Sequence, residues 1–345
     1  MSDKIVFIAH SYHKRTHSYD FIVDYLKKFY DVEIIFDEKW ETGKEIDWSV
    51  LDDSYKAIVI FQMFPDEKDF KKITNSNIVY MPMYDHVKKW HFKKWYDCKN
   101  IKIINFSYYL HKKLKKWGFN SIYIQYFIEP QKFSPGLENE VFFWQRLTKI
   151  NINTIKKIFK NSNIKIHIHK SVDPGQEFIK PSKNDEEHFK ITYSEWFDSK
   201  TELQGFTENM GIYIASRFTE GIGMSFLEAM AQGKFIIANN KPTMNEYIKH
   251  KKTGYLCNFK FPRPIKLSNI KAIQKNTYDY AKDGYKKWLN ERINIINFIN
   301  EPPHKTKLKL WTKIFLPFLL FNIREIIKFK LGSNPSLTLF GSKKF

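Results

Sequence analysis

Short apolar runs alternate with helical patterns along the first 130 residues of the chain. Each run is bounded by polar or turn residues, which is typical of strands buried in a parallel sheet. Helical spacing of apolar residues occurs at 18–29 and at 108–117, where Gly118 is a usual residue to end a helix. We therefore predict a parallel sheet covered by helices on both faces. The predicted strands are 4–9, 32–36, 57–61, 78–81, 101–106 and 121–126.

The same alternation starts again after residues 129–136 (EPQKFSPG), a stretch with two prolines and a glycine. Such a stretch is typical of a linker, so a second α/β unit is predicted to follow it. The pattern then becomes helical at 278–289 and 291–300, before Pro302 and Pro303. Two successive α/β units predict a ligand cleft between them. The second unit is predicted to have strands at 141–144, 164–169, 211–215 and 235–238 and helices at 153–160 and 225–232.

The length of 345 residues agrees with more than one domain. We predict an N-terminal Rossmann-like domain over 1–130 that binds the acceptor, and a second over 131–300 that binds the donor. Residues 301–345 form a separate basic tail in this interpretation.

The net charge of +20 favours partners that carry phosphate or other anionic groups. Residues 305–345 contain nine Lys or Arg and one acidic residue, together with Trp, Phe and Leu. That combination is typical of a segment at a membrane interface, although the segment could instead pack on the N-terminal domain. A nucleic-acid-binding protein is an alternative, but no recognised motif for one is present.

Two cysteines, Cys98 and Cys257, lie far apart and predict no disulfide framework. The first ten residues lack the pattern of a signal peptide, and the apolar stretch 314–321 is too short to cross a bilayer. We therefore expect a cytoplasmic protein, peripheral on the inner face of the membrane. His167 and His169 alternate on one strand without a third ligand, and no metal site is predicted.

Candidate chemistry is concentrated in residues 211–256, which predict a strand, a glycine-bearing loop, a helix, a strand and a second loop. Glycines at the helix start let the backbone approach a ligand, and free N–H groups there attract phosphate. Arg217 precedes the loop, while the carboxylates of Glu220 and Glu228 flank it. Carboxylates are suited to accept hydrogen bonds from sugar and ribose hydroxyls. Alternatively, Ser225 and Glu228 form only a capping box.

The string EGIGMSFLEAMAQGKFIIA, with Glu220 and Glu228 separated by seven residues, resembles the E-x7-E signature of GT-B glycosyltransferases of the GT4-like group. The segments NEYIKHKKTGYL and VFFWQRL resemble two further parts of the donor domain of that family. Where the family usually has Gly-Arg and a later Lys, this chain has Gln145-Arg146 and then Lys149.

The resemblance implies a retaining glycosyltransferase that needs neither a metal ion nor another cofactor. It implies that Arg146 and Lys149 neutralise the donor diphosphate, while Glu220 contacts the donor sugar and Glu228 the ribose. Arg217 adds positive charge at the same site. The backbone of the helix start would hold sugar and phosphate through Gly221, Ile222, Gly223, Met224 and Ser225.

Further candidates surround this segment. Glu246 is a possible donor contact, or only an acid that follows a strand. His86, in a Tyr-Asp-His sequence after a strand, is a candidate catalytic histidine. His10, His13 and Arg15 crowd the first strand-to-helix loop and are candidates to bind a phosphorylated acceptor.

The sequence therefore predicts transfer of a sugar from a nucleotide donor to a glycan. The expected acceptor is lipid-linked, as in the biosynthesis of surface polysaccharide or lipopolysaccharide. A non-catalytic GT-B scaffold is the second alternative, since the Gln-Arg segment departs from the family pattern.

Overall fold

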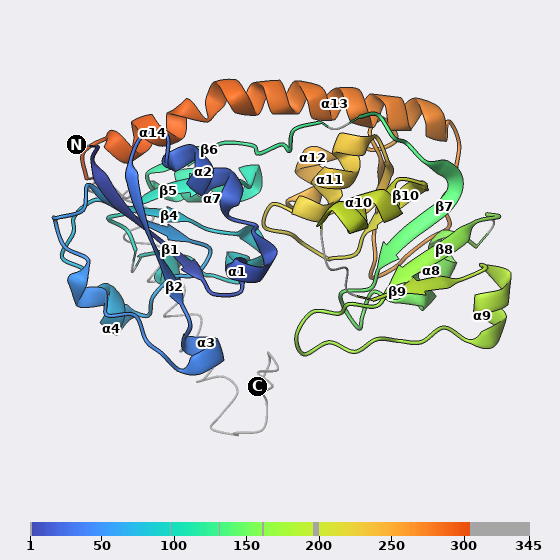
Figure 1. Ribbon diagram of the computed structural model, residues 1–345, viewed down its shortest axis with the longest axis horizontal. Helices are drawn as coiled ribbons and strands as arrows, with labels where there is room; N and C mark the ends of the chain where they lie inside the picture. The colour runs from blue at the N-terminus through green and yellow to red at the C-terminus, as the bar shows by residue number, and fades with distance from the viewer. Residues whose placement is uncertain (1, 97, 131, 161, 196–199, 304–345) are drawn as a thin grey trace, which may run out of the picture.

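The computed structural model describes residues 2–96, 98–130, 132–160, 162–195 and 200–303, and they form two α/β units side by side (Figure 1). Each unit is built around a six-stranded sheet whose pairings are all parallel. This is the architecture that the alternating pattern predicts. The basic tail, 305–345, lies outside the described residues.

The first sheet has the strand order β2-β1-β3-β4-β5-β6. All five residues of β3 are buried, as are residues 5–9 of β1, because helices cover both faces of the sheet. The strands are β1 (Lys4–His10), β2 (Asp31–Asp37), β3 (Ala57–Phe61), β4 (Ile78–Met81), β5 (Lys102–Asn105) and β6 (Ser121–Tyr123). The helices are α1 (His13–Thr16), α2 (Asp20–Leu26), α3 (Lys39–Thr42), η1 (Trp48–Val50), α4 (Glu67–Phe70), α5 (Tyr84–Val87), α6 (Phe92–Tyr96) and α7 (Tyr108–Trp117).

The second sheet has the order β12-β11-β10-β7-β8-β9, with two short strands at its edges that the apolar pattern does not predict. Its strands are β7 (Leu137–Trp144), β8 (Lys165–His169), β9 (Thr192–Ser194), β10 (Met210–Ala215), β11 (Phe235–Asn239) and β12 (Tyr255–Cys257). Its helices are α8 (Ile152–Ile158), α9 (Lys183–His188), α10 (Lys200–Thr207), α11 (Met224–Gln232) and α12 (Met244–Tyr247).

A long helix, α13 (Ile270–Glu291), runs from the second unit to the first, and α14 (Ile293–Asn300) continues it onto the first sheet (Figure 1). The hydroxyl of Tyr30 donates to Asn300, and the ammonium of Lys102 donates to the carbonyls of residues 299 and 301. A Cβ added at Gly284 of α13 would lie 2.5 Å from the ring of Phe127, which precedes the linker, so glycine permits this close approach. The end of the predicted second domain thus packs on the first.

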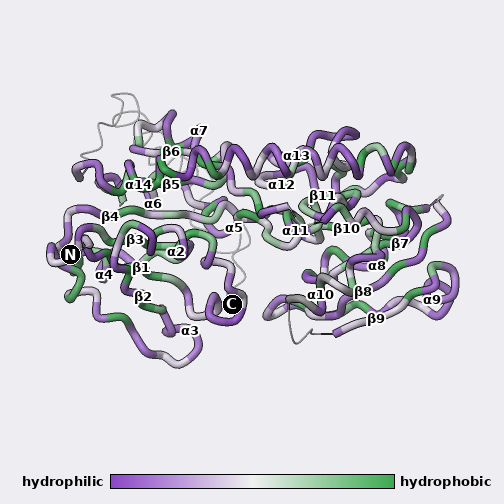
Figure 2. Tube along the Cα trace, turned by 45° about the horizontal axis from the view of Figure 1, so that its top comes forward, coloured by the Kyte–Doolittle hydropathy of each residue, from purple (hydrophilic) through white to green (hydrophobic). Residues whose placement is uncertain are grey.

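Hydropathy along the chain follows this packing, with apolar strands inside and polar loops outside (Figure 2). One buried apolar cluster extends from the first sheet through Tyr126 and Phe127, which precede the linker, to Phe226 and Tyr247 of the second unit. In the part of the chain that the structure describes, no helix has the length and apolar character needed to cross a membrane.

Candidate functional site

The carboxyl ends of four parallel strands bring the candidate residues together. Arg146 follows β7, Arg217 follows β10, and Asp173 lies in the loop after β8. From the other unit, α5 follows β4 and carries Asp85 and His86. Ligands of α/β proteins bind at such edges, because the loops after parallel strands converge there.

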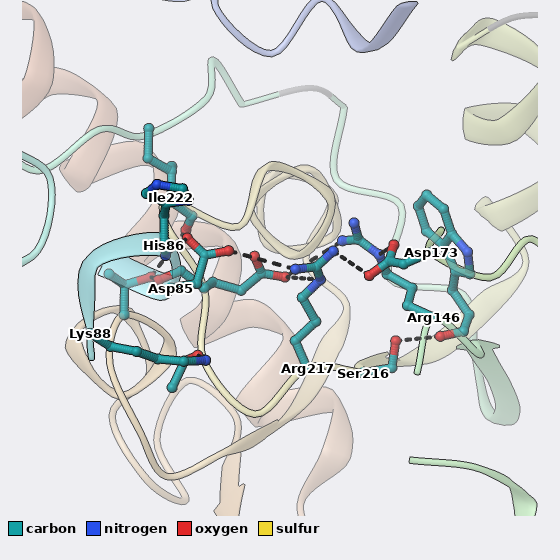
Figure 3. Close-up of polar contacts among 12 residues, drawn as sticks. Asp85, His86, Lys88, Arg146, Asp173, Ser216, Arg217 and Ile222 are labelled. Atoms are coloured by element: carbon teal, nitrogen blue, oxygen red, sulfur yellow. Dashed lines mark hydrogen bonds and ion pairs between the residues drawn. The ribbon is translucent and has the colours of Figure 1, made fainter. Parts of the chain in front are cut away.

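Two guanidinium groups and three carboxylates form one ion-pair cluster at this edge (Figure 3). Arg146 Nε lies 3.0 Å from Asp173 Oδ1, and its Nη1 lies 3.6 Å from Glu220 Oε1. Arg217 also donates to Asp173, while its Nε lies 3.7 Å from Glu220 Oε1 and its Nη1 lies 3.6 Å from Asp85 Oδ2. The cluster therefore links both units through Arg217 and Asp85.

Local contacts hold the two arginines in place. The Asp173 amide donates to the Arg146 carbonyl at 3.0 Å, and the Arg146 guanidinium lies over the Trp144 ring at 5.0 Å. Ser216 donates through its hydroxyl to the Trp144 carbonyl, which ties the end of β10 to the end of β7. Arg217 Nε is buried and donates to no acceptor among the described residues. Guanidinium groups that are held in fixed positions are suited to bind phosphate oxygens.

Burial raises the pKa of Glu220, while the charges of Arg217 and Arg146 act in the opposite direction. Burial by itself lowers the pKa of Arg146, but Glu220 and Asp173 outweigh it, so the pKa of that guanidinium is raised. Arg146 thus remains a cation. Both effects require the carboxylates and guanidinium groups to share a partly dry site.

The helix α11 begins at Met224, with Gly223 as its N-cap in the left-handed region at φ 87°. The alternative interpretation, a capping box, is therefore wrong, because Ser225 is already inside the helix and bonds the hydroxyl of buried Tyr213. Gly221 lies against the first unit, where an added Cβ would be 2.8 Å from Met83 Cβ. Ile222 is buried.

A cavity beside α11 includes the side chain of Glu228. Tyr213 and Ser225 line it from the strand and the helix, and Trp144 joins it to the ion-pair cluster. The remaining lining residues are Phe142, Leu203, Thr207, Ala229 and Gln232. The predicted donor residues Glu220, Glu228 and Ser225 therefore lie around one helix start.

Glu246 has partners in the other unit. Its carboxylate accepts from Ser107 Oγ at 2.9 Å and from the amides of Tyr108 and Tyr109 at 2.7 and 3.0 Å. These amides belong to the first turn of α7, where helical N–H groups have no partner within the helix. Glu246 therefore joins the two units, and its possible donor contact stays a prediction.

Replacing Glu246 with alanine should lower the free energy of unfolding by about 1 kcal/mol, the usual contribution of a helix cap. Glu246→Gln keeps one acceptor oxygen and should lose less. Urea unfolding followed by circular dichroism measures both. Equal midpoints for the wild type and Glu246→Ala would contradict this interpretation.

The remaining candidates have different surroundings. His86 is exposed, and its backbone amide donates to Asp85 Oδ1 at 3.0 Å. Lys149 is exposed in the turn after Arg146. His13 is buried in the core beside Phe61, with Nδ1 2.6 Å from Ser18 Oγ. Because burial lowers the pKa of His13 to about 4, that ring is neutral at pH 7 and offers no charge to a phosphate.

Asp173 and Asp85 are site residues that the sequence reasoning missed. Asp85 stands beside the candidate His86, and its position at the end of a strand could have drawn attention to it. Asp173 lies in a loop without an apolar pattern, so the sequence gives it no signal. Among the described residues, no group of three or more His, Cys, Asp or Glu side chains is placed to hold a metal ion.

Residues 128–275 match the family model of glycosyl transferases group 1. These residues belong to that family. The matched region contains both arginines, Asp173, Glu220 and Glu228. The match confirms the predicted family and the predicted enzyme class, a glycosyltransferase. A search of curated protein sequences gives no match.

Two solved structures similar to this chain, with TM-scores above 0.5, confirm the GT-B fold. The lipopolysaccharide outer core galactosyltransferase WaaB is 13% identical, with a TM-score of 0.54 over 85% of this chain and 99% of its own. Sucrose-phosphate synthase of Thermosynechococcus elongatus is 10% identical, with a TM-score of 0.51 over 94% and 99%. TarM is 14% identical with a TM-score of 0.48, and the match covers 72% of this chain but only 55% of TarM, so this chain spans about half of that protein.

Proposed function

We propose that this glycosyltransferase moves a sugar from a nucleoside-diphosphate donor to a glycan, with retention of anomeric configuration and without a metal ion. The observation that carries the proposal is the convergence of Arg146, Arg217 and Glu220 beside the start of α11. Two guanidinium groups can neutralise a departing diphosphate, which is the task that a metal ion performs in other transferases.

Each residue has a distinct role in this mechanism. Arg146 and Arg217 bind diphosphate oxygens, and the amides at the start of α11 bind sugar and phosphate. Glu220 accepts hydrogen bonds from donor sugar hydroxyls, and Glu228 accepts them from the ribose in the adjoining cavity. We propose Arg217 as the second cation beside the diphosphate, in place of Lys149, which the family resemblance implies and which is exposed in the turn after Arg146. Catalysis then rests on positioning and on stabilisation of the charge that develops on the leaving group.

A thermal-shift screen tests the donor site. We expect one of UDP, GDP, ADP or CMP, or a sugar conjugate of it, to raise the Tm of the protein, because a ligand that binds only the folded state stabilises it. The shift should be unchanged by EDTA and smaller in Arg217→Ala. Lys149→Ala, a change at the exposed turn, should shift like the wild type. Absence of any shift at millimolar ligand would favour a non-catalytic scaffold.

We propose in addition that the acceptor is a lipid-linked glycan of surface polysaccharide or lipopolysaccharide and that the protein is peripheral on the cytoplasmic face of the membrane. Residues 305–345 are one proposed contact with anionic lipid. A second basic region is residues 86–126, with one acidic residue and ten lysines, of which Lys102 is buried. The Phe92 and Trp117 rings, 5.4 Å apart, join α6 to α7, and three exposed tyrosines lie on these helices, Tyr96, Tyr108 and Tyr109. Lysines and tyrosines together suit the interface of an anionic membrane.

Charge reversal tests that surface on the full chain. Changing Lys93, Lys112, Lys115 and Lys116 to glutamate should weaken sedimentation with phosphatidylglycerol vesicles at least tenfold, since each basic residue near such a surface contributes roughly 1 kcal/mol. The matched control reverses exposed lysines of the second unit, which are Lys157, Lys160, Lys183 and Lys190. Equal losses in the two variants would show a response to net charge alone.

A further inference from the structure

The first unit carries a half-exposed tryptophan at the edge of the sheet where the candidate site lies. β1 ends at His10 and β2 ends at Asp37, and these two residues are paired in register. Trp40 follows on α3, directly after β2. Figure 1 shows α1 after the end of β1 and α3 after the end of β2. Trp40 thus lies on the ligand-binding edge of a parallel sheet.

Several contacts fix the orientation of the Trp40 ring. It stacks on the His10 ring, with centroids 4.9 Å apart and an interplanar angle of 22°. Its Nε1–H donates to Ser11 Oγ at 2.8 Å, and Ser11 Oγ in turn donates to Glu41 Oε2 at 3.1 Å. The Tyr12 ring meets it edge-on at 6.3 Å. The indole is therefore held in one place although it is 50% exposed.

A fixed and exposed aromatic ring is the arrangement expected of a binding surface. The Trp40 ring is held by a hydrogen bond to its nitrogen and by stacking on one face, while half of its surface stays open to solvent. Because its side chain is already ordered, a ligand that covers the open part of the ring meets little further loss of conformational freedom.

Trp40 lies at the same edge of the first sheet as the residues that face the donor side of the site. Trp40 stacks on His10 at the end of β1, and His86 follows β4 at the same edge of the first sheet. The backbone amide of His86 donates to Asp85, and Asp85 pairs with Arg217 of the candidate donor site. Trp40 therefore lies on the acceptor side of the same site.

The polar groups around the ring indicate an uncharged ligand. The Arg15 guanidinium lies 3.5 Å from Glu41 Oε1, so its charge is already matched by a carboxylate. His13 is buried and neutral, and burial also lowers the pKa of His10. A phosphate would find little unmatched positive charge here. Glu41 and Arg15 can instead exchange hydrogen bonds with hydroxyl groups beside an apolar ring face.

We propose that Trp40 is the platform on which a neutral pyranose ring of the acceptor glycan stacks, with Glu41 and Arg15 as partners for its hydroxyls. The proposal rests on the proposed function, because it assigns the acceptor subsite of that reaction. A pyranose presents C–H groups on one face and hydroxyls at its rim, and the open indole with its polar neighbours is complementary to both. It replaces the phosphorylated acceptor that the sequence predicted.

Saturation-transfer difference NMR of the full chain tests the platform. The probes are the methyl α- and β-pyranosides of glucose, galactose, mannose and N-acetylglucosamine. We expect saturation of the ring C–H protons of at least one probe by the wild type, and binding about tenfold weaker for Trp40→Ala, a factor equivalent to about 1.4 kcal/mol. Trp40→Phe should keep part of the signal. Phe261→Ala, at an aromatic residue of the second unit that is 75% exposed, is the matched control and should behave as the wild type.

The outcomes separate this proposal from the donor site. Saturation that is equal in the wild type and Trp40→Ala, or absent with every probe, would overturn the platform. The nucleotide thermal shift is measured on the same variants and should be the same in Trp40→Ala as in the wild type. If the nucleotide shift is absent while saturation depends on Trp40, the donor site is wrong and the sugar platform stands.

Discussion

Glu220→Gln should lower kcat by about 10² to 10³ while the protein stays folded, the loss typical of removing one group that stabilises a transition state. The carboxylate of Glu220 lies 3.6 Å from Arg146 and 3.7 Å from Arg217. Glutamine keeps the shape but not the charge, so the arginines lose a partner and the donor sugar loses a strong acceptor. Glu220→Ala should lose at least as much. Initial rates with the donor identified by the thermal-shift screen measure both effects.

The stability of the glutamine variant distinguishes a functional role from a structural one. Two guanidinium groups face three carboxylates in the cluster, and burial raises the pKa of Glu220, so the ionised form is costly in the folded state. A raised pKa stabilises the fold at low pH, and this contribution is lost as the pH rises through the raised value. Glu220→Gln should therefore be no less stable than the wild type at neutral pH. Below the ordinary glutamate pKa of 4.5, any advantage of the variant should disappear.

Glu138→Gln is the matched control, because Glu138 forms an exposed ion pair with Lys271 on the second unit. It should change neither turnover nor stability appreciably. Wild-type rates in both Glu220 variants would remove Glu220 from the site. Loss of folding in Glu220→Gln at neutral pH would instead make Glu220 a structural residue.

Much of the fold can be predicted because its strands are buried on both faces. β3 and β11 are apolar at nearly every position, so the sequence shows each of them as a continuous apolar run. The edge strands β9 and β12 are three residues long and only partly buried, so they carry no such pattern. The sequence pattern does not predict the first two turns of α13, because part of their buried face is polar. Their buried face includes Gln274 and Thr277, and Gln274 donates to carbonyls of residues 135 and 211.

The candidate site likewise contains residues that are close together in the sequence and residues that only the fold brings together. Arg217, Glu220 and Glu228 lie within twelve residues of one another, so a single segment displays them together. Asp173 pairs with arginines that are 27 and 44 residues away in sequence. No pattern of residues along the chain predicts these two contacts. The sequence pattern also predicts the start of α11 one residue late, at 225 instead of 224. Ser225 is a favoured capping residue, but its hydroxyl bonds Tyr213, and glycine occupies the N-cap.

Asp173→Asn should have opposite effects on nucleotide binding and on turnover. Asp173 accepts from Arg146 Nε and from Arg217, and it holds both guanidinium groups toward the same point. Without its charge, the site repels a diphosphate less, so the nucleotide should raise the Tm at least as much as in the wild type. The arginines lose their fixed orientation, however, and kcat should fall about 10- to 100-fold, since misplaced groups stabilise the transition state poorly.

This split makes Asp173 a positioning residue, because a mainly structural role would weaken binding and turnover together. Asp279→Asn is the matched control, since Asp279 pairs with Lys275 on the exposed side of α13, and it should leave both quantities unchanged. A loss of the nucleotide shift in Asp173→Asn would mean that Asp173 holds the fold of the donor site rather than the orientation of its arginines. Unchanged turnover would mean that Trp144 and Glu220 position Arg146 without it.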